Sequence, residues 1–118
     1  MAEQTIELTE GEKGTQLVNI KHDDGSVYDL SLNGGYTVQM YVHEDTEDDV
    51  GTNIVNGQTV AILTAAQGAC SWTFDLSTAT FRNTRAFWKC WLESADSTVK
   101  RFTRPQPFIG RRNRTGAS

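Results

Sequence analysis

The sequence has few of the features that mark membrane, secreted or metal-binding proteins. Its 118 residues include only 2 Cys and 2 Pro, and no apolar run approaches the roughly 18 residues that a membrane helix needs. The N-terminal segment has no basic stretch followed by an apolar one, so we expect no secretory signal. Cys70 and Cys90 lie in neither a Cys-x-x-Cys nor a zinc-type spacing. We therefore expect no membrane partner, and two thiols that are buried and reduced.

Catalytic motifs are also missing. The 2 His of the chain, His22 and His43, lie beside acidic residues, and no serine sits in a Gly-x-Ser-x-Gly elbow. No glycine-rich phosphate loop is followed by a helix and a lysine. The acidic segment from Glu44 to Asp49 lacks the alternating oxygen spacing and central glycine of a dedicated calcium loop. We expect no enzyme activity, no catalytic residue, no cofactor and no metal site, with calcium at the acidic segment as the open alternative.

The chain does have an uneven distribution of charge. Its net charge of -4 combines 13 acids and two bases in residues 1–80 with two acids and nine bases in residues 81–118. One interpretation is that both signs mix on the folded surface. The other is an acidic body with a basic C-terminal segment that binds acidic partners. A sequence pI near 5.0 argues against a dedicated nucleic-acid partner.

Short strands separated by turn residues recur along the chain. In Tyr36–His43, Val38, Met40 and Val42 alternate with outward-pointing residues, which predicts one face on the core and the other toward solvent or a partner. The dipeptide Asn56-Gly57 predicts a hairpin that joins strands over 50–55 and 58–63. Residues 64–68 fit a single helical turn. The other expected strands cover residues 5–8, 15–21, 27–32, 69–75, 86–92 and 99–103, with a short apolar piece at 108–109.

This pattern predicts an all-β fold, an immunoglobulin-like β-sandwich of about 7–9 short antiparallel strands. The spacing of Cys70, Trp72 and Cys90 does not match the cysteine and tryptophan pattern of a true immunoglobulin domain, so we expect a sandwich of that general type. We expect the sandwich to span residues 1–110. Residues 111–118 are then a basic C-terminal arm.

Six residues are candidates for an interface. Phe87, Lys89 and Trp91 share one face of an expected strand, where they either stack on sugars or bases, or fill a subunit contact or the core. Arg111, Arg112 and Arg114 belong to the expected arm, and their planar guanidinium groups suit pairing with carboxylates of a neighbouring molecule.

The order of these motifs resembles the N-terminal domain of phage baseplate upper proteins. The resemblance spans about residues 5–111 and is carried by Ile6, Glu10-Gly11, Leu17–Ile20, Asp24–Leu30, Tyr36–Val42, Ala66–Asp75, Ala86–Leu92 and Phe102–Pro105. It implies an immunoglobulin-like sandwich used as a building block of a virus tail or baseplate. One departure is Gly14-Thr15, which stands where that family has a Gly-Asp-like turn.

The resemblance implies a structural virion protein, a small tail, baseplate or neck subunit that assembles in the host cytoplasm. Its partners are then other virion proteins and further copies of itself in the particle. Family members are commonly larger, with a receptor-binding or fibre part, so we expect an accessory subunit. Two other functions stay open: a capsid decoration or head-fibre subunit, and a carbohydrate- or surface-binding module that uses exposed aromatic residues.

Overall fold

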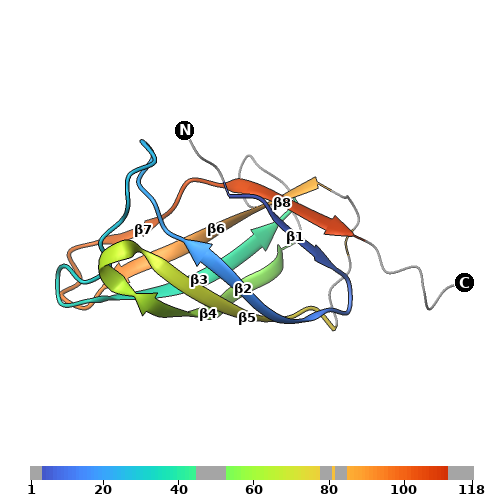
Figure 1. The fold of residues 1–118 in the computed structure, drawn as a ribbon, viewed down its shortest axis with the longest axis horizontal. Helices are drawn as coiled ribbons and strands as arrows, with labels where there is room; N and C mark the ends of the chain where they lie inside the picture. The colour runs from blue at the N-terminus through green and yellow to red at the C-terminus, as the bar shows by residue number, and fades with distance from the viewer. Residues whose placement is uncertain (1–3, 45–52, 78–80, 82–84, 112–118) are drawn as a thin grey trace, which may run out of the picture.

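The computed structural model describes residues 4–44, 53–77, 81 and 85–111 (Figure 1). Its elements are β1 (Ile6–Thr9), β2 (Lys13–Asn19), β3 (Tyr36–His43), β4 (Asn53–Thr64), the 3-10 turn η1 (Ala65–Gln67), β5 (Ala69–Asp75), β6 (Arg85–Ser94), β7 (Lys100–Phe102) and β8 (Gln106–Arg111). The predicted all-β fold is confirmed: the eight strands form one curled, mixed sheet with a sandwich-like shape. The predicted helical turn is confirmed by η1.

Strand β4 connects the two layers of the curled sheet. The strand order is β1-β8-β6-β3-β4-β5-β2, and β7 pairs with β6 beside β8. The first part of β4 pairs with β3, its last part pairs with β5, and Val60 lies opposite both Val38 and Trp72. One long strand therefore passes from the layer of β3 and β6 to the layer of β5 and β2 (Figure 1).

The core lies between these layers and follows the period-two alternation of the sequence. In β3, Val38, Met40 and Val42 are buried, and in β6 the side chains of Trp88 and Cys90 are fully buried. Trp72 enters from the opposite layer, and its indole N–H donates to Gln58 Oε1 over 2.8 Å. The burial of alternate residues on both layers is what a sandwich of this size needs to exclude water.

The pairing of β1 with β8 differs from the prediction of an entirely antiparallel sheet. Residues Ile6 to Thr9 pair in parallel with Phe108 to Arg111. After β1 the chain does not fold back as a hairpin. It crosses at residues 10–12 to the other layer, where Gly11 and Glu12 bond Leu76 and β2 begins its pairing with β5. This crossing leaves β1 beside the last strand, and both run in the same direction (Figure 1).

Gln4 closes the side of the sandwich on which β1 and β2 are the edge strands. Its side-chain amide donates to the carbonyl of Leu17 and accepts the N–H of Asn19, at 2.7 and 3.0 Å. Its backbone N–H donates to Gln106 Oε1, and its carbonyl accepts the indole N–H of Trp88, at 2.7 and 2.9 Å. One residue thus bonds strands of both layers.

One predicted strand and one predicted hairpin are corrected. Residues 27–32 alternate in burial, but Tyr28 bonds Ile20 and Leu30 bonds Ala65, so the backbone follows no single neighbouring strand beyond one bridge from Val27 to Lys21. The expected hairpin at Asn56-Gly57 is also wrong, because β4 continues through it. Met40 lies opposite Gln58 and Tyr41 opposite Asn56, so Gly57 is the extra residue of a β-bulge.

The two thiols are free and buried, as the sequence predicts. Burial raises the pKa of the Cys70 thiol to about 11. Burial also raises the pKa of the Cys90 thiol, with a smaller contribution from Cys70. Because the thiolate is the reactive form, both cysteines should be inert while the fold is intact.

Thiol counting tests this expectation. At mildly alkaline pH, folded protein should react negligibly with a thiol-specific dye, whereas protein unfolded without reductant should react at both cysteines. A rapid reaction in the folded state would contradict the burial of the thiols. The absence of reaction after unfolding would show a disulfide.

Candidate functional site

Strand β6 presents a row of large side chains away from the core. Its burial alternates, with Trp88 and Cys90 inside and with Phe87, Lys89 and Trp91 on the other face. The structure therefore places the three candidate residues of this strand together, as the sequence predicts for one strand face. Each is partly covered by its neighbours, and Lys89 is buried.

Strands β3 and β7 widen this row into a face. Across the β3–β6 ladder, Gln39 lies opposite Trp91, Tyr41 opposite Lys89 and His43 opposite Phe87. On the other side, Phe102 of β7 lies opposite Trp91, and Lys100 lies opposite Glu93. We call this set the outer β6 face: Gln39, Tyr41, His43, Phe87, Lys89, Trp91, Glu93, Lys100 and Phe102. His43 and Lys89 are buried within it.

The centre of the outer β6 face is an aromatic cluster with one cation. The rings of Tyr41 and Phe102 meet edge to face, with centroids 5.3 Å apart at 84°. Trp91 and Phe102 are 4.8 Å apart at 66°. The Lys89 ammonium lies 4.1 Å from the centroid of Phe102, within the range of a cation–π contact. Phe102 still exposes 38% of its surface.

The geometry of these rings does not suit the stacking of a sugar or a base, one of the binding modes that the sequence leaves open. A sugar or base stacks on an open, flat ring face. Here Lys89 lies over Phe102, and the Tyr41 and Trp91 rings stand steeply to it. The three rings therefore form no continuous flat platform. Aromatic side chains such as these are enriched at protein interfaces.

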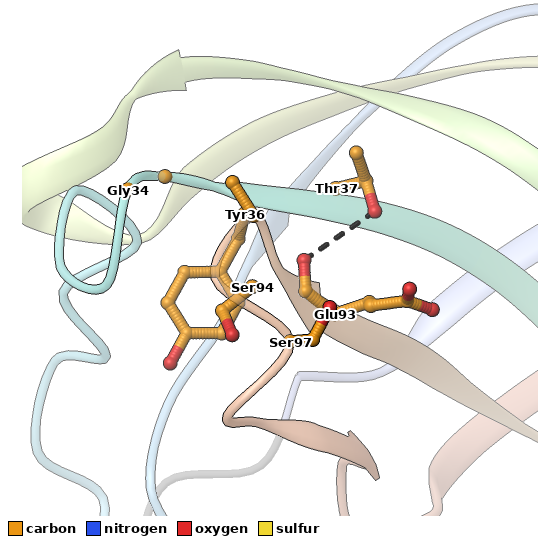
Figure 2. A pocket seen from close by; sticks show the side chains of 8 residues that line it. Gly34, Tyr36, Thr37, Glu93, Ser94 and Ser97 are labelled. Atoms are coloured by element: carbon orange, nitrogen blue, oxygen red, sulfur yellow. Dashed lines mark hydrogen bonds between the residues drawn. The ribbon is translucent and has the colours of Figure 1, made fainter.

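A small polar cleft adjoins the outer β6 face where β3 begins and β6 ends (Figure 2). Its volume is about 360 Å³, and its lining comes from the start of β3, the end of β6 and the turn after β6: Gly34, Gly35, Tyr36, Thr37, Glu93, Ser94, Ala95 and Ser97. The Thr37 hydroxyl donates to the Glu93 carbonyl over 3.4 Å, as the dashed line shows. The Glu93 carboxylate accepts the Trp91 indole N–H over 3.2 Å.

The Ser94 hydroxyl of this cleft serves the turn that follows β6. The Ser94 hydroxyl donates to Asp96 Oδ1 over 2.7 Å and accepts the Val99 N–H. Asp96 also accepts the Thr98 hydroxyl and N–H, at 2.6 and 3.0 Å. These bonds, that of the Thr98 hydroxyl first, lower the pKa of Asp96 below its ordinary value. Ser94 is therefore occupied in holding a turn rather than poised as a nucleophile.

A titration tests the role of Asp96. Its carboxyl carbon should titrate by NMR below the ordinary midpoint of 3.8, and Thr98→Val should move the midpoint up. Because the folded pKa is the lower one, the ionised carboxylate stabilises the fold above the unfolded pKa, and this contribution disappears as the pH falls through the folded pKa. Asp75, which Ser77 holds in the same way, serves as the internal control and should not shift in Thr98→Val. An unchanged Asp96 midpoint in the variant would contradict the assignment.

The two histidines lie apart from this cleft. His22 stacks on Tyr28 at 4.3 Å between ring centroids, and with Asp23, Asp24, Ser26 and Arg101 it lines a shallow depression. His43 is buried in β3, with its ring 6.2 Å from that of Phe87. Among the residues that the structure describes, no group of three or more His, Cys, Asp or Glu is placed to hold a metal ion. Most of the acidic segment, residues 45–49, lies outside the described residues.

Arg111, which the sequence analysis assigns to the C-terminal arm, belongs instead to the sheet. Arg111 is the last residue of β8, and its guanidinium forms an ion pair with Glu7 of β1. Its carbonyl accepts the N–H of Glu10 over 2.9 Å, so strand pairing holds this residue in the sandwich. Arg112 and Arg114 lie outside the described residues.

Two members of the aromatic cluster, Tyr41 and Phe102, come from outside the predicted interface. The sequence predicts the position of Tyr41, because the alternation of Tyr36–His43 points its side chain away from the core. The sequence does not predict the position of Phe102, because β7 is only three residues long and all three residues are exposed.

Comparisons with known proteins do not identify this face. Neither the scan against protein-family models nor the search of curated proteins finds a match for the chain. No helix within the described residues has the length and apolar character to span a membrane.

Proposed function

We propose that this chain is a non-catalytic structural protein of a virus particle, a small tail, baseplate or neck subunit that docks onto other virion proteins through its outer β6 face. The aromatic cluster of Tyr41, Trp91 and Phe102 carries the docking part of the proposal. Such residues supply much of the binding energy at protein interfaces, where they are enriched relative to the rest of the surface. The virion part is supported by the resemblance of the strand and turn order to baseplate upper proteins.

The ring geometry supports a protein partner over a carbohydrate. Lys89 occupies a face of Phe102, and the neighbouring rings stand across it. A protein side chain can fill the angles between such rings, whereas a pyranose ring needs one open aromatic plane. The Ser94 hydroxyl of the adjacent cleft bonds within its own turn, which supports a structural rather than a catalytic role for this residue.

Incorporation into particles tests this proposal. Particles should be assembled with chains that carry Trp91→Ala and Phe102→Ala, and capsids and tails should then be separated on a gradient. We expect wild-type chain in the tail fraction and a loss of about tenfold or more for the double variant, because two central aromatic contacts are removed. The matched control is Leu17→Ala with Leu63→Ala, which removes two apolar side chains that are 60% and 58% exposed on other strands.

The control should incorporate like the wild type, and circular dichroism should show that both double variants are folded. Equal incorporation of the aromatic variant would refute docking through this face. Chain found only on capsids would favour a decoration subunit. Specific binding of a glycan that depends on Trp91 and Phe102 would favour the carbohydrate-binding module.

A further inference from the structure

The outer β6 face has a charge that restricts its partners. Arg85 and Lys100 are exposed, Lys89 is buried at the centre of the row, and Glu93, which lies opposite Lys100, supplies the opposite sign at one end, so the net charge is positive. An acidic surface with exposed apolar side chains is the complementary partner.

The chain itself carries such a surface in residues 21–32, which we call the 21–32 loop. It holds three acids, Asp23, Asp24 and Asp29, against one base, Lys21, and it exposes the side chains of Val27 and Leu32 by 46% and 56%. These are two of the five large apolar residues that are exposed among the described residues. The loop therefore combines net negative charge with exposed apolar side chains, whereas the outer β6 face combines net positive charge with aromatic side chains.

The 21–32 loop is held in shape by its own contacts. Tyr28 and Leu30 are buried and anchor it to the core. Asp24 accepts the N–H and hydroxyl of Ser26, and Asp29 accepts those of Ser31. A surface that is ordered before binding loses less conformational entropy when it docks.

Within one molecule this loop does not reach the outer β6 face. Along β7, Lys100 and Phe102 point outward, and Arg101 between them points to the opposite side because strand residues alternate. Arg101 is the β7 residue that meets the loop, in the depression that it shares with His22, Asp23 and Asp24. The loop therefore lies against the inner side of β7, and the outward side is left for another molecule.

We propose that the outer β6 face binds the 21–32 loop of a second copy of this chain. This inference rests on the proposed docking function and names the partner. Because the face and the loop lie on opposite sides of β7, one partner cannot engage both at once, so the contact is heterologous and each bound copy still presents one free loop or one free face. Repetition then gives a ring or an open helical assembly rather than a closed dimer.

The test uses the full chain and two complementary variants. The face variant carries Lys100→Glu and Phe102→Ala, and the loop variant carries Asp23→Lys and Leu32→Ser. Sedimentation equilibrium follows the molar mass at low salt up to about 1 mM protein, the range in which weak contacts are seen. Wild-type mass should rise with concentration beyond that of a dimer, and salt at about 0.5 M should weaken the association because it screens exposed charge pairs.

Each variant alone should associate at least about tenfold more weakly than the wild type. An equimolar mixture should form dimers and stop there, because the intact face of the loop variant binds the intact loop of the face variant. The control Lys13→Glu with Leu63→Ser changes charge and apolar area elsewhere and should associate like the wild type.

Wild-type protein that stays monomeric at the highest concentration would overturn the proposal. Association that ends at a dimer, or a mixture that associates no better than its components, would also overturn it. The proposed function has a separate readout: if Trp91→Ala with Phe102→Ala is lost from particles while the wild type is monomeric, the face docks onto a different virion protein.

Discussion

Replacing Trp88 with alanine is expected to lower the free energy of unfolding by about 3–5 kcal/mol, as for other large aromatic residues in cores. Trp88 is fully buried in the central strand β6, between Val42 of β3 and Gln106 of β8. Its indole N–H is also the donor that holds the carbonyl of Gln4. The variant therefore loses core volume, and it also loses the hydrogen bond from the indole to Gln4, the residue that joins the edge strands.

Urea unfolding followed by circular dichroism measures this loss. The control is Trp91→Ala, which removes the same side chain from the outer β6 face, where it is only partly buried. Its cost should be smaller, roughly 1–2 kcal/mol. Equal costs for the two variants would mean that the inward and outward faces of β6 are assigned incorrectly. A marginal domain has only about 5–15 kcal/mol in total, so Trp88→Ala should be close to unfolded in mild denaturant.

Replacing Gly68 with alanine is expected to cost about 2–5 kcal/mol, because backbone strain and steric overlap add together. Gly68 follows η1 with a φ of 65°, a left-handed conformation that favours glycine. A Cβ at this position would lie 2.5 Å from the carbonyl oxygen of Ile20 and 2.8 Å from that of Tyr28. Both are backbone atoms, so the clash cannot be relieved by a change of rotamer.

Gly35 provides the matched control for this experiment. Its φ is 94°, but a Cβ there would meet no atom within 4 Å. Gly35→Ala should therefore cost only the backbone strain, about 1–2 kcal/mol. Thermal unfolding of both variants separates the two effects, and the excess for Gly68→Ala measures the close approach of the two carbonyls. An equal loss in both variants would show that the backbone relaxes around Gly68.

The elements that the sequence predicts best are those buried on one face. The bounds Tyr36–His43 and Ala69–Asp75 are confirmed in β3 and β5, because alternating burial leaves only one register that keeps the apolar side chains inside. The same alternation predicts that Phe87, Lys89 and Trp91 share the outward face of β6.

The misassigned elements depend on long-range contacts that the sequence does not display. Asn56-Gly57 is a strong hairpin signal, but Gly57 uses its φ of 86° for a bulge, and a Cβ there would lie 3.2 Å from the Tyr41 hydroxyl. A positive φ at glycine serves a bulge as readily as a turn, so the dipeptide alone could not distinguish them. Gln4 has no periodic pattern around it, and its role depends on β2, β6 and β8 meeting it.

The outer β6 face was predicted in part for the same reason. The residues on β6 follow from one strand's alternation, but Phe102 joins them only because the chain turns at Asp96 and returns beside Trp91. The register of that return is set by the hydrogen bonds of Ser94, Asp96 and Thr98. Local sequence shows a turn there but not which side chains it brings together.

The parallel pairing of β1 with β8 has a mechanical consequence. Tension applied between the two ends of the chain would pull β1 toward its start and β8 toward its end, so the strands would slide lengthwise past each other. In this shear geometry all the hydrogen bonds between Ile6–Thr9 and Phe108–Arg111 carry the load together, and the ion pair of Glu7 with Arg111 ties the same two strands. Force entering at one end therefore passes to the other through this ladder, and the core stays closed until the whole ladder breaks.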